Sequence, residues 1–380
     1  MRVYNADVVF DGKNLLSPGA VVVRDGTVEA VVPRHYAGPE CEHAGRFITP
    51  GLVDPHTHCG VSPEGQAVSE SDVNEFTDPL TPDLLALDSL DATDPAFRRA
   101  LMGGVMAVMV LPGSSNVLGG QGCLVRVTLG GRAEPVEERA CLKCAISKFF
   151  YGRQKKAPAT RMAVYAMLRQ AFEESRKPAG EAPAAARSPG VSRIPESGKR
   201  AIQRVLRREV PLRVHLMTAS EILATLRLAA EFDISVVLDH ATEAHFVARE
   251  IRERDVPVVY GPLFVPRDGR GRKWRKAQTA AFLIENGIRV ALMTDNPIVP
   301  VEYLRLEAGL LIREGVPPQK ALAAITSVAA SIAGCSAPSG TIEAGKRADL
   351  VAWTGEPWQP GSRPSKLVSG PDEYVPGRTV

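Results

Sequence analysis

Short apolar runs separated by polar turns open the chain. Residues 6–13, 19–32 and 45–51 read ADVVFDGK, GAVVVRDGTVEAVV and GRFITPG, and Asp-Gly pairs occur between apolar stretches. Alternation with a period of two is typical of half-buried strands, and Asp-Gly is a frequent hairpin turn. The first fifty residues therefore predict a β-meander.

From Gly51 the pattern changes to short apolar runs that alternate with longer segments of helical periodicity. Helical patterns occur at residues 95–104, 219–232, 241–254, 275–287 and 301–315. Eight runs have the length and composition of strands: residues 51–58, 103–113, 123–129, 141–146, 211–216, 234–240, 256–263 and 287–295. Repeated strand and helix alternation predicts parallel strands joined by right-handed crossovers, and eight units suffice to close a barrel.

The remaining segments place this barrel between β-rich chain ends. Residues 317–334 predict one helix, and residues 340–358 predict strand and turn again. We therefore expect an α/β protein with a TIM-like (β/α)8 barrel, residues 51–341, inserted into a small β-sandwich domain formed by residues 1–50 and 342–380. The Pro/Ala-rich residues 177–198 predict a mobile surface loop between two helices.

Composition and charge narrow the classes of partner. Apolar residues make up 44% of the 380 residues, and the formal net charge is +3. That charge is too small and too evenly spread to indicate nucleic acid or an anionic membrane surface, so we expect a small-molecule substrate. Six cysteines are too few for a disulfide framework. No secretory signal or spanning apolar run is recognisable, which favours a cytoplasmic protein; a homo-oligomer is compatible with the sequence.

Candidate chemistry begins with His56 and His58 in the stretch GLVDPHTHCG. Alternate residues of a strand point to the same face, so these two imidazoles could chelate one ion. His215, His240 and Asp295 each close another predicted strand, and the carboxyl ends of parallel barrel strands meet at the catalytic face. Each residue alone is more simply explained as a polar strand end, but five such coincidences favour a metal centre.

Imidazole nitrogens combined with a carboxylate form a ligand set suited to Zn²⁺, with Mn²⁺, Fe²⁺, Co²⁺ or Ni²⁺ as other candidates. The sequence leaves open whether the centre holds one ion or two.

The order His-x-His, His, His, Asp resembles the amidohydrolase superfamily. ITPGLVDPHTH at residues 48–58 and GTIEAGKRADLVAW at residues 340–353 carry the same resemblance, which covers nearly the whole chain. Within the superfamily the chain is most similar to imidazolonepropionase-related members and, more distantly, to dihydroorotase-like members.

The resemblance implies specific roles. His56, His58 and Asp295 would hold the more buried metal, while His215 and His240 would bind a second metal or hold the first metal and the substrate. Asp295 and His240 would be the catalytic residues, and Asp295 would also transfer protons.

Lys143 stands where two-metal relatives carry a carboxylated lysine that bridges the ions. An unpaired buried lysine is costly, so Lys143 is either modified in this way or paired with an anionic neighbour.

The resemblance also implies the reaction, which is hydrolysis of a non-peptide C–N bond, as in a cyclic amide, by a metal-bound hydroxide. A dipeptidase or N-acyl amino acid hydrolase of the same superfamily is the first alternative, and a catalytically silent scaffold is the second. The basic residues 264–276 follow the seventh strand and form either a solvated loop or a lid whose Arg267 or Lys273 meets an acidic substrate.

Overall fold

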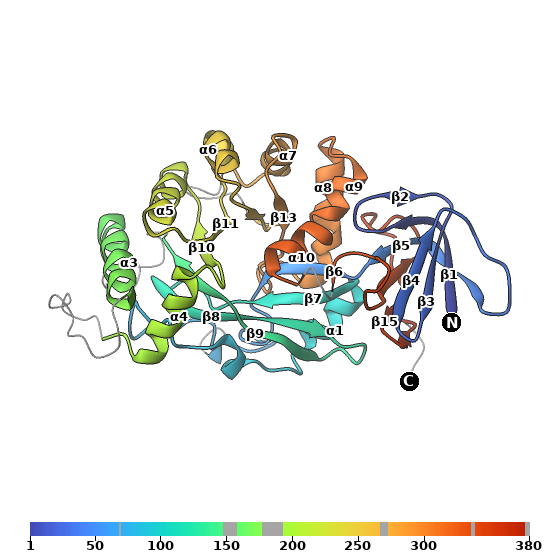
Figure 1. Cartoon of the computed structure of the whole chain (residues 1–380), viewed down its shortest axis with the longest axis horizontal. Coiled ribbons are helices and arrows are strands. Elements are labelled where there is room, and N and C mark those ends of the chain that lie inside the picture. Colours follow the sequence, from blue (N-terminus) through green and yellow to red (C-terminus); the bar gives the residue numbers. More distant parts are fainter. Residues whose placement is uncertain (68–69, 147–157, 177–192, 267–272, 336–338, 377–380) are drawn as a thin grey trace.

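Two eight-stranded sheets organise the chain in the computed structural model, one forming a nearly closed barrel and the other lying beside it (Figure 1). The structure describes residues 1–380 except 68–69, 147–157, 177–192, 267–272, 336–338 and 377–380. None of the helices in the described ranges combines the length and apolar character that a membrane-spanning helix needs.

All eight strands predicted for the barrel are present, and they neighbour one another in sequence order. Their bounds are β6 (Leu52–Thr57), β7 (Val105–Val110), β8 (Leu118–Val127), β9 (Ala133–Ala145), β10 (Leu212–Leu216), β11 (Val236–His240), β12 (Val258–Tyr260) and β13 (Val290–Leu292). Apolar side chains from these strands fill the barrel interior; Val53, Met109, Val237 and Ala291 belong to one buried cluster there.

The prediction of eight parallel strands with helical crossovers is wrong at β8. This strand pairs antiparallel with both β7 and β9, while the other neighbouring strands of the barrel pair in parallel. Only residues 111–117 and 128–132 connect these three strands. A parallel connection needs a dozen residues or more, whereas such short links allow only reversal of direction.

Helices follow β6 and each strand from β9 to β13. Their bounds are α1 (Pro95–Met102), α3 (Arg161–Arg176), α4 (Glu196–Leu206), α5 (Ala219–Phe232), α6 (Ala248–Glu253), α7 (Ala277–Glu285), α8 (Leu304–Arg313), α9 (Pro318–Ala323) and α10 (Ser327–Ala333). In Figure 1, α5, α6, α7 and α8 form a row along one side of the barrel sheet. The predicted mobile loop at 177–198 lies largely outside the described residues, and α4 begins within its last part.

The single helix predicted over residues 317–334 is two helices, α9 and α10. The backbone leaves the helix between them because it supplies hydrogen bonds at the barrel seam. The carbonyl of Ala324 accepts from Leu292 N at 3.0 Å, and that of Ile325 accepts from Val53 N at 2.9 Å. Residues 324–325 therefore bridge β13 and β6 through backbone hydrogen bonds, and α10 packs against both strands.

Strands from both chain ends share the second sheet, in the order β16-β15-β14-β5-β1-β3-β4 with β2 paired to β1. Their bounds are β1 (Arg2–Phe10), β2 (Leu15–Leu16), β3 (Gly19–Arg24), β4 (Thr27–Val32), β5 (Cys41–Pro50), β14 (Asp349–Trp353), β15 (Pro364–Ser369) and β16 (Asp372–Tyr374). The predicted meander holds for β1, β3 and β4, but β5 pairs with β1 in parallel. The hydrophobic pattern marks strands and does not specify their direction, so the correction comes from the tertiary pairing.

Trp353 links the two sheets. Its side chain is fully buried, and its indole N–H donates to the Thr49 hydroxyl at 3.0 Å. Gly104, at the start of the β7 region, has φ +77°, and a Cβ there would lie 2.5 Å from the Trp353 ring. The position therefore excludes a side chain both by backbone conformation and by space.

We expect Gly104→Ala to lower the free energy of unfolding by about 3 kcal/mol, because left-handed strain and overpacking each cost about 1–3 kcal/mol. Gly287→Ala is the matched control, since Gly287 has φ +76° and no atom within 4 Å of its Cβ position. This control should lose only the strain part. Urea unfolding measures both, and equal losses would rule out the contact with Trp353 as a cause.

Candidate metal centre

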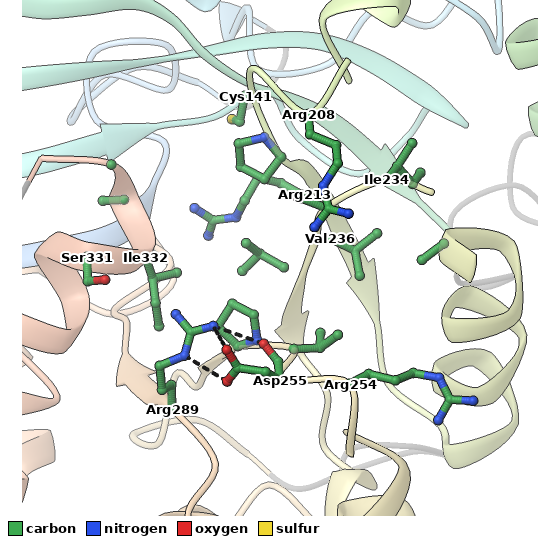
Figure 2. A pocket seen from close by; sticks show the side chains of 18 of the residues that line it. Cys141, Arg208, Arg213, Ile234, Val236, Arg254, Asp255, Arg289, Ser331 and Ile332 are labelled. Carbon is green, nitrogen blue, oxygen red and sulfur yellow. Dashed lines mark hydrogen bonds and ion pairs between the residues drawn. The ribbon is translucent and has the colours of Figure 1, made fainter. Parts of the chain in front are cut away.

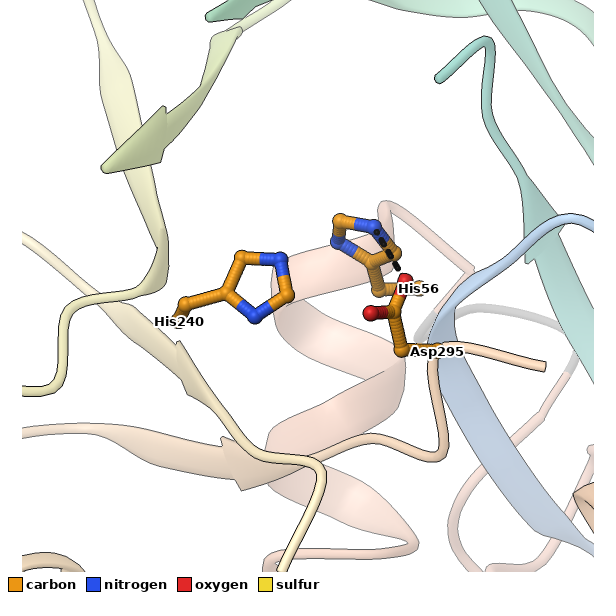
Figure 3. Close-up of side chains that lie close together, drawn as sticks. All are labelled: His56, His240 and Asp295. Carbon is orange, nitrogen blue, oxygen red and sulfur yellow. Dashed lines mark ion pairs between the residues drawn. The ribbon is translucent and has the colours of Figure 1, made fainter. Parts of the chain in front are cut away.

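Three side chains from distant parts of the chain converge at the carboxyl ends of the barrel strands. His56 comes from β6, His240 ends β11, and Asp295 follows β13. One potential ligand atom of each residue lies within 4.8 Å of those of the other two (Figure 3). Among the described residues, these three form the cluster of His, Cys, Asp or Glu side chains that could hold a metal ion. His56 and His240 are buried, and the Asp295 side chain is 14% exposed.

Backbone pairing at the barrel seam sets this geometry. The carbonyl of His56 accepts from Asp295 N at 3.2 Å, and His58 N donates to the carbonyl of Asn296 at 2.8 Å. The ends of β6 and the segment after β13 therefore run side by side. Both His240 and Asp295 have left-handed backbone, with φ +66° and +54°. Such values are uncommon outside glycine and often occur at functional sites.

Asp54 strengthens the same seam from inside the protein. Its carboxylate accepts from the Thr294 hydroxyl at 2.6 Å, from Thr294 N at 3.1 Å and from His56 N at 3.1 Å. Burial raises the pKa of Asp54 to about 7. This fully buried group therefore fixes the backbone on both sides of the site.

The hydrogen bonds of the histidines direct their second ring nitrogens into the site. The Nδ1 atom of His58 lies 2.7 Å from the carbonyl of Leu111, and that of His240 lies 3.0 Å from the carbonyl of Gly261. Nδ1 must carry the proton in order to donate to a carbonyl oxygen. In the neutral ring, Nε2 then has a free lone pair that can bind a metal. Metal-binding histidines are typically held in this way.

Burial keeps two of these rings uncharged. It lowers the pKa of His56 to about 4 and that of His240 to about 3. Burial acts to raise the pKa of Asp295, but the hydrogen bond with His58 and the rings of His240 and His56 outweigh it and hold that pKa below its ordinary value. Neutral imidazoles and an ionised carboxylate are the protonation states that a metal requires.

The other two predicted histidines lie at the same centre. The Nε2 atom of His58 is 3.3 Å from Asp295 Oδ1, and His56 Nε2 is 3.4 Å from the same oxygen. The buried ring of His215 packs against that of His240, with centroids 4.2 Å apart. The structure thus brings His56, His58, His215, His240 and Asp295 together.

Lys143 on β9 also reaches the centre and has an anionic neighbour. Its Nζ atom lies 3.3 Å from His56 Nε2 and 3.7 Å from Asp239 Oδ2, and its side chain is 1% exposed. Burial lowers the pKa of Lys143, and the charge of Asp239 acts against that shift. Asp239 thus supplies the anionic neighbour expected of an unmodified lysine, and carboxylation of Lys143 stays a prediction.

Sequence reasoning missed Arg213 and Asp239, which lie directly behind His56. Both side chains are fully buried, and Arg213 Nη2 donates to Asp239 Oδ1 at 2.6 Å. The sequence does contain a feature that could have identified Arg213. It precedes His215 by two residues on the same strand, so both side chains face the barrel interior. A charge at an inward position of a buried strand requires a partner.

A cavity of about 610 Å³ lies at the opposite end of the barrel (Figure 2). Its lining includes Pro211, Ser235 and Pro257, which precede β10, β11 and β12, and the ion pair of Arg289 with Asp255 at 3.1 Å. Barrel enzymes carry their active sites at the carboxyl ends of the strands. We therefore do not assign the substrate to this cavity.

The predicted lid falls mainly outside the described residues, which exclude 267–272 and so Arg267. Lys273 is exposed, and its Nζ atom lies 5.1 Å from the centroid of the Trp274 ring. Its contact with a substrate stays a prediction.

Comparisons with known proteins agree on one family. Residues 47–373 match the sequence profile of the Amidohydrolase family. Amidohydrolase tasK of Hapsidospora irregularis is 29% identical over 386 residues, which cover 92% of this chain and 39% of that protein. The chain thus spans well under half of tasK. Imidazolonepropionase of Methylobacterium sp. (strain 4-46) is 25% identical over 393 residues, covering 94% of this chain and 91% of that protein.

A solved structure is similar over the whole fold. An amidohydrolase from Thermotoga maritima superposes with a TM-score of 0.86 at 32% identity, covering 98% of this chain and 99% of that chain.

Proposed function

Because the chain belongs to the amidohydrolase family, we propose that it is a metal-dependent hydrolase that opens a cyclic amide by cleaving a non-peptide C–N bond. The observation that carries this proposal is the convergence of His56, His240 and Asp295 at the carboxyl ends of the barrel strands. Similarity to imidazolonepropionase over 94% of the chain supports a ring-opening reaction over cleavage of a linear dipeptide or N-acyl amino acid.

The residues present fit a divalent metal. The Nε2 atom of His240 is buried and has no hydrogen-bond partner among the described residues, as a ligand atom awaiting an ion would. We propose His56, His58, His240 and Asp295 as ligands, with Zn²⁺ as the ion that this donor set suits best. When bound, such an ion supplies a nucleophile from water near neutral pH and polarises a carbonyl oxygen.

Asp295 would move the proton in this reaction. Its carboxylate stays ionised at neutral pH because His58 and His240 hold its pKa down. It can accept a proton from the attacking water and deliver it to the leaving nitrogen. His215, buried against His240, would bind the substrate carbonyl.

We propose that Lys143 stays an amine and that the centre holds one ion. Its ion pair with Asp239 at 3.7 Å meets the need for an anionic neighbour without a carbamate. A carboxylated Lys143 bridging two ions is the alternative, and metal stoichiometry distinguishes the two.

Elemental analysis combined with a substrate screen tests the proposal. Purified protein should contain about one divalent ion per chain, unchanged by bicarbonate in the growth medium, and should hydrolyse cyclic amides faster than N-acyl amino acids or dipeptides. Two ions per chain with bicarbonate dependence would establish the carbamate. A preparation that cannot be loaded with metal and turns over none of these substrates would identify a silent scaffold.

A further inference from the structure

We propose that Arg213 and Asp239 form a clamp that fixes the orientation of the His56 ring, so that both are positioning residues for the metal centre. This inference rests on the proposed function. It adds two residues that touch neither the metal nor the substrate but determine how one ligand is presented.

The clamp holds His56 through its ring and through its backbone. Asp239 Oδ2 lies 3.3 Å from His56 Nδ1, the ring nitrogen that faces away from Asp295, in a close contact that falls short of hydrogen-bond geometry. Arg213 Nη2 donates at 2.8 Å to the carbonyl of Pro55, the residue before His56. The peptide before this ligand is therefore hydrogen-bonded to the pair, and its ring contacts the same pair.

Arg213 grips Asp239 with two nitrogens. Nη2 donates to Oδ1 at 2.6 Å, and Nε lies 3.1 Å and 3.2 Å from the two carboxylate oxygens. A forked guanidinium fixes the plane of a carboxylate as well as its distance. The plane of the Asp239 carboxylate in turn determines where an imidazole N–H can donate.

Charge and burial favour a defined role for this pair. Asp239 and Arg213 are fully buried, on adjacent parallel strands β11 and β10. Replacing a buried ion pair by apolar residues is often neutral for stability, so stability alone gives no reason for charge at this point. A carboxylate behind a metal-binding histidine fixes its tautomer and raises its basicity, and loss of such a group typically costs 10–100-fold in metal affinity.

Metal affinity measured on folded, metal-free protein tests the clamp. We expect Asp239→Asn to raise the dissociation constant for Zn²⁺ about 10–100-fold, measured by competition with a chromophoric chelator. The visible absorption of the Co²⁺-loaded protein should change as well, because the ligand field depends on the ring orientation.

Two further variants cover the case in which Asp239→Asn removes the ion-pair partner of both Arg213 and Lys143 and does not fold. Arg213→Lys keeps the positive charge but cannot hold Asp239 and the Pro55 carbonyl together, so it should lose part of the affinity. Arg213→Met combined with Asp239→Asn removes both charges of the pair and also the ion pair of Asp239 with Lys143, which Arg213→Lys retains. This double variant should fold, and its dissociation constant for Zn²⁺ should be at least about 10-fold higher than that of the wild type.

Asp349→Asn is the matched control. Asp349 on β14 is also buried, at 6% exposed, and also pairs with an arginine, Arg347 at 3.2 Å, but it lies in the other sheet. Its loss should lower stability without changing the Zn²⁺ affinity. Folded clamp variants with wild-type affinity and an unchanged Co²⁺ spectrum would overturn the clamp. Wild-type protein that binds no metal would instead overturn the proposed function and the clamp with it.

Discussion

Asp295→Asn is expected to reduce turnover by about 10³-fold or more while leaving the fold intact. The amide cannot accept the proton of the attacking water, and it is a weaker metal ligand than a carboxylate. The side chain keeps its size, and asparagine adopts the left-handed backbone of this position, φ +54°, as readily as aspartate does. The effect should therefore appear in kcat, with the melting temperature of the metal-free protein nearly unchanged.

Asp255→Asn provides the matched control for this substitution. Asp255 also has left-handed backbone, at φ +48°, but it pairs with Arg289 at the amino-terminal end of the barrel. Its variant should keep wild-type turnover. If Asp295→Asn hydrolysed the substrate at a rate near that of the wild type, the assignment of Asp295 would be wrong.

Removal of the metal by a chelator is expected to abolish activity and to lower the melting temperature. The four proposed ligands, which lie in β6, just after it, at the end of β11 and after β13, would then lose the ion that joins them and keep only their contacts within the protein. An ion present at 1,000 times its dissociation constant stabilises the folded state by about 4 kcal/mol, and chelation removes that contribution. Activity and melting temperature should both return when Zn²⁺ is added back.

His240→Ala supplies the control for the chelation experiment. This variant lacks a proposed ligand, so chelator should change its melting temperature far less than that of the wild type. Full activity of the wild-type protein after exhaustive chelation, confirmed by elemental analysis, would contradict a metal-dependent mechanism.

The local pattern determined the elements but not all of their directions. Each of the eight barrel strands was predicted because its apolar run is short and bounded by turn residues. β8 was assigned the wrong direction, since a run of apolar residues reads the same whichever way the strand points. The division of residues 317–334 was missed for a related reason. Helical periodicity continues through Ala324 and Ile325, whereas their carbonyls are needed by Val53 and Leu292 at the seam.

The sequence by itself determined which residues could form a metal centre. His56, His58, His215, His240 and Asp295 end strands, and the ends of barrel strands meet. Only the tertiary structure decided what stands behind them. Arg213 and Asp239 carry charges at buried positions, and Asp54 places an ionisable carboxyl at another. A charge or an ionisable group in low dielectric is stable only with partners that other strands provide. Such partners are distant in sequence, so the contacts of Arg213 and Asp239 with His56 and Pro55 exist only once β6, β10 and β11 are assembled.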